Sequence, residues 1–265
     1  ELVPAMDLRK NKLYPVMAAL YHPTAGVIRH DAVVWGYARS AKRMGVHIVP
    51  FTKVIDLIVC RNRVSGIKTI NKEVSAKIVV NATAGWASTI ANMANIKLPI
   101  TTHPLQVAVT EPLKPFLDTT VSSANFHVYA YQTDRGEVVI GGGVDAYPSY
   151  SMRSSLSSIH HLVSNTLKMF PMLRDIRLLR QWSGLCDMTP DYAPVIGRVN
   201  GIDGFLLTCG WGSWGFKAAP MAGKSVAELI FTGKTPELIK PFRLSRFSTG
   251  KILNERASAP AAAVH

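Results

Sequence analysis

The sequence predicts a mixed α/β protein that combines strand-turn-helix pieces with an antiparallel sheet. Two segments, residues 78–95 and 205–231, each place an apolar strand before a small-residue turn and a helix. Between them, residues 101–142 alternate apolar and polar positions, as the strands of an antiparallel sheet do. With 265 residues, 48% of them hydrophobic, the chain can bury one large or two smaller cores.

The first predicted elements are a helix and a strand. Residues Asp31–Met44 have helical spacing, with Asp31 as a possible cap and Gly45 as the end. The expected inner face of this helix consists of small and aromatic side chains: Ala32, Trp35, Gly36 and Ala38. The next segment, VHIVPF at residues 46–51, is expected to form a strand.

A hairpin follows, because two extended runs flank the turn signal Arg61–Arg63. The next strand, Lys77–Asn81, precedes a small-residue turn and a helix. That arrangement brings backbone N–H groups and a helix N-terminus close to a ligand. Beyond Ile100, the period-two segments predict an antiparallel sheet with a turn at Arg135–Gly136.

A second long helix is predicted over Ser154–Phe170, where apolar residues recur at helical spacing and Pro171 ends the pattern. The chain then forms a strand, a proline-rich crossing, another strand, a glycine turn and a last helix that ends near Gly233. The tail Ser258–His265 has no core-forming pattern, so we expect order there only against a partner.

Charge and cysteine content exclude several classes of function. The net charge is +13, but the basic residues are scattered, so we expect no nucleic-acid binding. No apolar run is long enough for a membrane span. The three cysteines form no CxxC motif, which predicts neither a metal site nor a disulfide and favours a reducing cytoplasm. The segment that begins at Glu1 lacks a secretory pattern and is interpreted as an internal start.

Gly210, Gly212 and Gly215 have GxGxxG spacing between a strand and a helix, the layout of a dinucleotide-binding turn. The motif is incomplete, because no acidic residue ends a second parallel strand about twenty residues later. A plainer interpretation stays open, in which the glycines only allow a tight turn beneath two tryptophans.

Lys217 places a cation in the first turn of a helix whose N-terminal end is already positive. This arrangement destabilises an empty protein and suits a site for an anion. Such an anion could be a substrate carboxylate or a flavin that gains negative charge on reduction. The alternative is an ordinary surface lysine.

The histidines give weaker signals. His30 lies at a helix start, where a capping hydrogen bond or a buried ring is the default explanation. His127 alternates with Tyr129 and Tyr131, so all three are expected on one face of a strand, in a site or in an interface. No Ser/His/Asp order, HExxH motif or glycosidase-like acid pair is present.

Three ordered motifs, IVVNATAGWA, RQWSGLCDMTPDYAPVIG and TCGWGSWGFK, resemble the C-terminal half of the D-amino acid oxidase-like flavoproteins. Longer segments, among them HPTAGVIRHDAVVWGYARSA and CGWGSWGFKAAPMAG, are similar to the beta subunits of heterotetrameric sarcosine oxidases. The resemblance implies an FAD-dependent α/β fold that lacks its N-terminal βαβ segment and carries an antiparallel substrate domain. It also implies that the carboxylate-binding arginine lies upstream of Glu1.

The activity implied by this resemblance is the oxidative demethylation of sarcosine to glycine. Non-covalent FAD accepts a hydride, covalent FMN receives the electrons, and oxygen is reduced to hydrogen peroxide. Tetrahydrofolate is the implied one-carbon acceptor in the full complex, and the implied partners are the alpha, gamma and delta subunits. Two alternatives stay open: an oxidase or dehydrogenase of another amine, such as dimethylglycine or proline, and a non-catalytic assembly subunit.

The resemblance also assigns cofactor contacts residue by residue. His30 matches the histidine that bears FMN covalently, and Arg29 beside it would face that flavin. A neutral imidazole suits this attachment because its nitrogen is nucleophilic near neutral pH. The implied contacts with FAD are Val54, Gly212, Ser213, Gly215 and Lys217.

The implied catalytic set consists of Lys217, His127 and Tyr129, with no metal. Lys217 matches the lysine that binds the substrate carboxylate, and the other two match positions near the substrate face of the ring. Trp214 departs from the family pattern, in which a small residue is usual, and so implies a narrower substrate pocket.

The same resemblance predicts the domain boundaries. Residues 24–98 and 181–235 are expected to be parts of a discontinuous FAD-binding domain. Residues 1–23 and 99–180 are expected to form the substrate-binding domain, and residues 236–265 a C-terminal tail.

Overall fold

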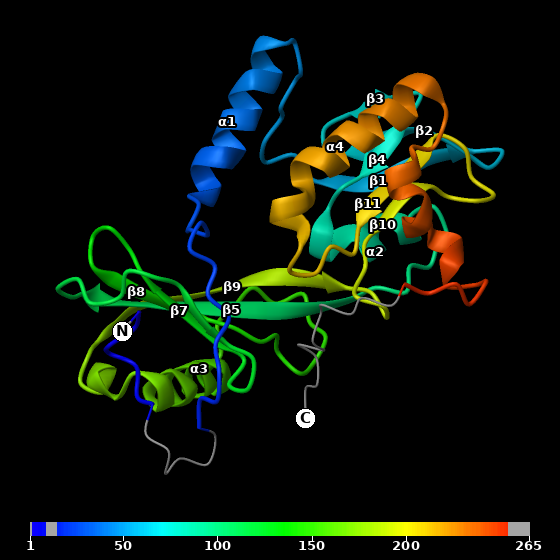
Figure 1. Ribbon diagram of the computed structural model, residues 1–265. Helices are drawn as coiled ribbons and strands as arrows, with labels where there is room; N and C mark the ends of the chain where they lie inside the picture. Colours follow the sequence, from blue (N-terminus) through cyan, green and yellow to red (C-terminus); the bar gives the residue numbers. More distant parts are fainter. Residues whose placement is uncertain (1, 9–14, 254–265) are drawn as a thin grey trace. The chain divides into compact units, whose positions relative to one another are not determined.

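The computed structural model describes residues 2–8 and 15–253 (Figure 1). The chain divides into two compact units. Among the described residues, the first unit comprises 2–28 and 104–185, and the second comprises 29–103 and 186–253. The functional role of each unit stays a prediction, and the predicted tail Ser258–His265 lies outside the described residues.

An antiparallel sheet organises the first unit, as the sequence predicted. Its strand order is β6-β7-β8-β5-β9. The strands are β5 (Thr101–Pro112), β6 (Val121–Ser123), β7 (Val128–Gln132), β8 (Glu137–Gly141) and β9 (Leu178–Met188). The predicted turn joins β7 to β8, where Gly136 has a φ of 100° that favours glycine. The division between the two units falls within β5 and β9.

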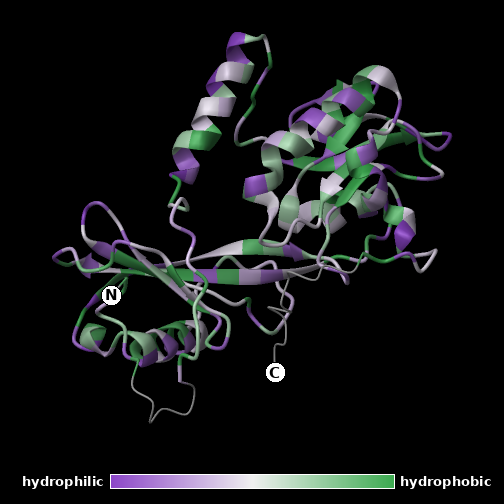
Figure 2. Ribbon diagram, in the orientation of Figure 1, coloured by the Kyte–Doolittle hydropathy of each residue, from purple (hydrophilic) through white to green (hydrophobic). Residues whose placement is uncertain are grey.

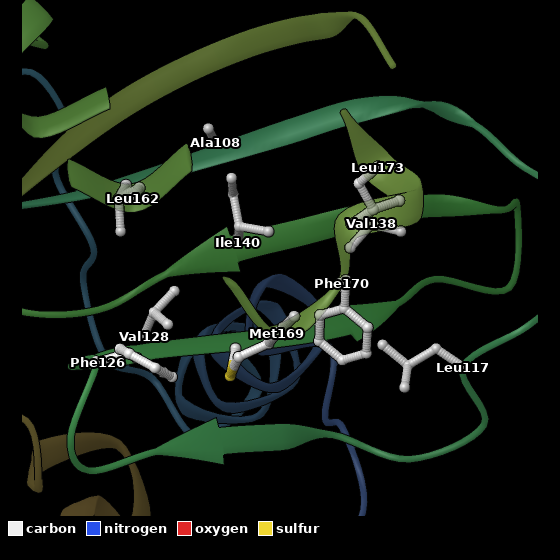
Figure 3. Close-up of a cluster of buried hydrophobic side chains, with 11 residues drawn as sticks. Ala108, Leu117, Phe126, Val128, Val138, Ile140, Leu162, Met169, Phe170 and Leu173 are labelled. Carbon is white, nitrogen blue, oxygen red and sulfur yellow. The ribbon is translucent and has the colours of Figure 1, made fainter. Parts of the chain in front are cut away.

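Helix α3 (Leu156–Met169) and the short helix η2 (Pro171–Leu173) cover one face of this sheet. Figure 3 shows the core between the sheet and these helices, with apolar side chains from the strands packed against those from α3 and η2. Ser155 caps α3, because its hydroxyl accepts the Ser158 N–H at 3.2 Å. The predicted helix over Ser154–Phe170 is therefore confirmed within one or two residues at each end.

The second unit begins with α1 (His30–Arg43), which confirms the first predicted helix. Its N-cap is Arg29, and no side chain caps it, so the expected capping role of Asp31 is wrong. No residue of α1 is buried, and Trp35 is 62% exposed. The expected inner face is thus not packed within the described part of the chain. Figure 2 shows hydrophobic and hydrophilic positions along this helix.

Residues 46–51 form no strand, which corrects the sequence prediction. Pro50 lacks a backbone donor, and Phe51 has a φ of 54°, so the extended run is interrupted. The predicted hairpin is confirmed as β1 (Val54–Cys60) paired with β2 (Arg63–Thr69), and β3 (Glu73–Ser75) adds a third strand. Arg61 and Asn62 both have positive φ, the conformation of two-residue hairpin turns that match strand twist.

A three-stranded sheet of order β10-β11-β4 forms the centre of the second unit. Strands β10 (Val195–Arg198) and β11 (Phe205–Cys209) are antiparallel, whereas β4 (Val79–Asn81) runs parallel to β11. Short helices η1 (Ala84–Trp86) and α2 (Ala87–Asn92) follow β4, and α4 (Gly215–Thr232) follows β11. These strand-turn-helix pieces confirm the prediction from residues 78–95 and 205–231.

Alternating side chains of β11 enter two hydrophobic cores, one on each face of this sheet. Phe205 and Leu207 pack in the core that includes α2 and the hairpin. Leu206 packs in the core that includes α4 and the short helix η3 (Glu237–Phe242). A last short helix, η4 (Leu244–Arg246), follows η3. The sheet is therefore buried on both faces, as expected for parallel strands of an α/β layer.

Candidate functional site

Two turns leave the same edge of the central sheet of the second unit. In the parallel register, Val79 lies opposite Phe205 and Asn81 lies opposite Leu207. The carboxyl ends of β4 and β11 therefore meet at one edge, and residues 82–86 and 210–214 both continue from there (Figure 1). In α/β sheets this edge is the usual place for a nucleotide ligand.

Side-chain hydrogen bonds fix the turn after β4. The buried Asn81 amide donates from Nδ2 to the Ala87 carbonyl oxygen at 2.9 Å. The Thr83 hydroxyl donates to Asn81 Oδ1 at 2.7 Å, and the Thr102 hydroxyl donates to the Gly85 carbonyl oxygen at 2.7 Å. Because these polar groups are satisfied within the turn, its backbone is held in one shape.

The turn after β11 depends on glycine. Gly210 and Gly212 have φ values of 70° and 53°, in the left-handed region. A Cβ atom at Gly210 would lie 2.5 Å from Thr189 Cγ2, so a larger residue does not fit there. The glycines therefore do allow a tight turn, as the plainer interpretation held. A tight turn does not rule out a ligand on the side of the turn that faces away from Thr189.

Asp187, at the end of β9, holds this glycine turn, and sequence reasoning missed it. The residue is 2% exposed, and its Oδ2 accepts the Gly210 N–H. The Asp187 carbonyl oxygen accepts the Gly212 N–H at 2.9 Å. Burial raises the pKa of the Asp187 carboxyl, and the N–H groups of the turn oppose this rise. The sequence did contain one sign of its role: Asp187 is an acidic residue within the otherwise apolar segment GLCDM, where a buried carboxylate needs hydrogen-bond donors.

The glycine turn leads into the N-terminus of α4. The Trp214 N–H donates back to the Trp211 carbonyl oxygen at 2.9 Å, and no side chain caps the helix. In any α-helix the first N–H groups have no intrahelical acceptor, so those of Gly215 and Phe216 are available to an anion. Ser213 precedes the helix with an exposed side chain.

Lys217 lies in the first turn of α4, as predicted, and its side chain is exposed. Its Nζ atom is 4.8 Å from the centroid of the Trp214 ring, within the range of a cation–π contact. The positive end of the helix and this ammonium group therefore lie together. Binding of a carboxylate by Lys217 stays a prediction.

The residues assigned to FMN and to the adenine end of FAD lie elsewhere in the second unit. Arg29 and His30 are exposed at the start of α1. Val54 is the half-buried first residue of β1, in the hairpin sheet rather than the central one. Their cofactor contacts stay predictions.

His127 and Tyr129 belong to the first unit, whereas the glycine turn and Lys217 belong to the second. Tyr129 stacks on Tyr131 with ring centroids 6.4 Å apart, so these two share a face of β7 as expected. Burial, and then the neighbouring Tyr131, raise the pKa of Tyr129. His127 precedes β7 with a φ of 49°, outside the regular alternation.

A Cβ atom at Gly141 would lie 2.5 Å from the Tyr129 hydroxyl oxygen, and one at Gly142 would lie 2.2 Å from the His127 carbonyl oxygen. Both glycines therefore permit a close approach of β8 to this segment.

Two further observations concern ions and membranes. Within residues 2–8 and 15–253, no group of three His, Cys, Asp or Glu side chains is arranged to hold a metal ion. In the same part of the chain, no helix combines the length and hydrophobicity that a membrane crossing needs.

The parallel strand pair and its two turns place the protein in the α/β class, and comparison with known proteins specifies the family. The family model described as FAD dependent oxidoreductase matches residues 1–229. The chain therefore belongs to the FAD-dependent oxidoreductase family. This confirms the predicted fold class.

Among characterised relatives, the chain is 37% identical to sarcosine oxidase subunit beta from an Arthrobacter species over 262 residues, 99% of this chain and 64% of that protein. It is 38% identical to the subunit of the same name from Rhodobacter capsulatus, over 98% of this chain and 62% of that protein. The predicted resemblance to these beta subunits is confirmed. The chain spans less than two thirds of their length.

Solved structures agree on the fold. L-proline dehydrogenase from P. horikoshii superposes with a TM-score of 0.75 and 31% identity, over 83% of this chain and 60% of that one. Glycine oxidase from Geobacillus kaustophilus superposes with a TM-score of 0.72 over 81% of this chain and 57% of that one. Its identity of 22% supports the fold alone.

Proposed function

We propose that the protein is a subunit of a flavin enzyme that catalyses the oxidative demethylation of sarcosine. The products are glycine and a one-carbon unit at the oxidation level of formaldehyde. The observation that carries the proposal is the parallel pair β4–β11, whose two turns meet the N-terminus of α4 and its Lys217 at one edge. Similarity to sarcosine oxidase beta subunits supports the choice of substrate.

The residues at this edge fit a flavin. In the proposal, FAD lies against the glycine turn and the first turn of α4, with Gly212, Ser213 and Gly215 along it and Val54 toward its adenine end. The bound flavin supplies an acceptor for a hydride from the amine. The helix N-terminus stabilises the negative charge that a flavin ring gains on reduction, because its N–H dipoles point toward that charge.

Lys217 holds the substrate carboxylate in this proposal. Its ammonium group extends the positive field of the helix end, and the Trp214 ring beneath it limits where the side chain can go. A single charge-assisted hydrogen bond of this kind is worth about 1.5 to 3 kcal/mol. His127 and Tyr129 remain proposed catalytic residues, Tyr129 as a neutral phenol because burial raises its pKa.

We further propose that His30 carries FMN covalently, with Arg29 beside it favouring the anionic forms of that flavin. Both side chains are exposed, and so accessible to a cofactor. Oxygen is the proposed final acceptor, with hydrogen peroxide as product, and tetrahydrofolate takes the one-carbon unit. The proposed setting is a cytoplasmic complex with alpha, gamma and delta subunits. The subunit names of the relatives support a complex of this kind.

A second candidate is the oxidation of proline or of another secondary amino acid. The structural likeness to L-proline dehydrogenase, at 31% identity, favours it. Proline and sarcosine share a secondary amine next to a carboxylate, so the same lysine would serve both. Dimethylglycine is the corresponding tertiary amine.

The deciding experiment is anaerobic reduction of the flavin in the complete, co-expressed subunit. Sarcosine, dimethylglycine and proline are each added, and bleaching of the flavin absorbance is followed. The proposal requires the fastest reduction by sarcosine, and faster reduction by proline would favour the second candidate. A subunit with no flavin absorbance at all would instead indicate a non-catalytic assembly role.

A further inference from the structure

The backbone and the side chain of Asp187 both bind the glycine turn. The carboxyl group accepts the Gly210 N–H, and the carbonyl oxygen accepts the Gly212 N–H at 2.9 Å. These contacts span more than twenty residues of sequence and join the end of β9 to the segment between β11 and α4. The activity proposed above assigns no role to Asp187.

The contacts determine which donors of the turn remain for a ligand. The N–H groups of Gly210 and Gly212 are directed at Asp187, and the Trp214 N–H is directed at Trp211. The N–H groups of the first turn of α4, beginning at Gly215, have no intrahelical acceptor and remain for a ligand. The turn therefore presents the helix end to a ligand rather than its own glycine amides.

The turn needs such a partner because glycine does not fix its own backbone. Without a Cβ atom, Gly210 and Gly212 can rotate to conformations that other residues cannot reach. A buried N–H without an acceptor is unfavourable, so loss of the Asp187 carboxylate would favour rotation of the Gly210 peptide toward solvent or ligand. The carboxyl group thus keeps an otherwise adaptable turn in one conformation.

Asp187 also places an ionisable group against the glycine turn on which the proposed flavin would lie. The neighbouring thiols of Cys186 and Cys209 are buried and neutral, since burial raises their pKa values to about 11 and about 12. When the Asp187 carboxyl is ionised, its charge opposes the gain of negative charge by a ring on the other side of the turn.

We propose that Asp187 is a positioning residue. It holds the Gly210–Trp214 turn so that the N-terminus of α4, and not the glycine amides, faces the flavin, and its charge lowers the flavin reduction potential. This inference rests on the proposed function for the identity of the ligand. The placement of the turn by Asp187 does not depend on that identity.

The test compares Asp187→Asn with the wild type in the flavin-loaded, complete subunit. Hydrogen exchange of a peptide covering residues 206–217 is measured by mass spectrometry, together with the flavin midpoint potential and the flavin dissociation constant. We expect faster exchange in this peptide, a more positive potential and roughly tenfold weaker flavin binding, because a neutral amide oxygen replaces the charged acceptor of the Gly210 N–H.

Thr110→Val is the matched control, because Thr110 is also buried and its hydroxyl accepts a backbone N–H, that of Val138, at 2.9 Å in the first unit. It should lower stability without changing exchange at 206–217 or the potential. Should Asp187→Asn lose stability while exchange and potential stay at wild-type values, the positioning role is overturned.

Should Asp187→Asn not fold, Asp187→Glu keeps the charge but moves the carboxylate by one methylene group. Faster exchange at residues 206–217 supports the inference, and unchanged exchange overturns it. A flavin that no amine reduces would instead contradict the proposed function, and the exchange measurement would still decide the role of Asp187.

Discussion

Arg246 and Asp191 form an ion pair inside the second unit, with Arg246 Nε 2.8 Å from Asp191 Oδ2 and both side chains 1% exposed. A second guanidinium nitrogen donates to Asp191 Oδ1 at 2.9 Å and to the Ala193 carbonyl oxygen at 2.7 Å. The pair ties η4 to the segment between β9 and β10. Every polar atom of the contact is matched, as a buried charge requires.

We expect Asp191→Ala to destabilise the protein by about 3 to 5 kcal/mol, because it leaves a buried guanidinium group without its partner charge. Urea denaturation followed by circular dichroism measures the change. Lys240→Ala is the control, since it removes an exposed ion pair with Glu237 and should cost about 1 kcal/mol or less. Equal effects of the two variants would contradict the structural importance of the buried pair.

The same pair predicts a pH dependence. Burial acts to raise the pKa of Asp191, but the hydrogen bonds and charge of Arg246 prevail and hold it below the ordinary value of 3.8. The stability that the pair provides is therefore present above pH 3.8 and is lost as the pH falls through the lowered pKa. Asp191→Asn lacks this group, so the stability gap between wild type and variant should close in acid. A gap that stays constant below that pH would contradict the assignment.

We expect Lys217→Ala to raise the KM for sarcosine by roughly 10- to 150-fold, the equivalent of one charge-assisted contact of about 1.5 to 3 kcal/mol. Lys217→Arg should recover part of the loss. Lys224→Ala removes another exposed lysine from the same helix and should leave the KM unchanged. Steady-state kinetics decide the matter, and an unaltered KM in Lys217→Ala would make Lys217 an ordinary surface lysine.

For His30, we expect replacement by Ala to release FMN on denaturation. Denaturing gel electrophoresis viewed for flavin fluorescence checks this, because only a covalent flavin stays on the chain. His47→Ala is a suitable comparison, since His47 is also exposed and lies just beyond α1. Fluorescence that persists on the chain in His30→Ala would show that the attachment site is elsewhere.

The three cysteines should differ sharply in reactivity. Cys60 is exposed, whereas Cys186 and Cys209 are buried, and burial first and the nearby Asp187 second raise their pKa values to about 11 and about 12. Since the thiolate is the reactive form, iodoacetamide at neutral pH should label Cys60 and leave the other two unlabelled until the protein is denatured. Peptide mass spectrometry reads out the result, and rapid labelling of Cys209 in the native protein would contradict its burial in the core.

Local patterns in the sequence were sufficient to predict the hairpin, the strand-turn-helix pieces and α3, because turn residues and periodicity act over a few positions. Two predictions failed because they concern contacts with other parts of the protein, which local patterns do not encode. Residues 46–51 have strand-like composition, but a strand also needs a neighbour, and Phe51 turns the chain away. The inner face expected for α1 requires a surface to pack against, which periodicity alone does not supply.

In the candidate site, too, local features could be predicted from the sequence and long-range contacts could not. Glycine spacing and the position of Lys217 were visible in the sequence, because both lie within one turn and one helix start. Asp187 was missed because its partner Gly210 lies 23 positions away, and the Arg246–Asp191 pair was missed because its partners are 55 positions apart. Hydrogen bonds over such separations leave no periodic signal.

The exposure of α1 affects how the protein can be handled. Val34, Trp35 and Tyr37 are each at least 58% exposed, so this helix of 14 residues presents three large apolar or aromatic side chains at its surface. Such a surface adheres to other surfaces, to detergents and to further copies of itself. Preparations of this chain alone should therefore gain yield and homogeneity from mild detergent or from co-expression with the proposed partner subunits.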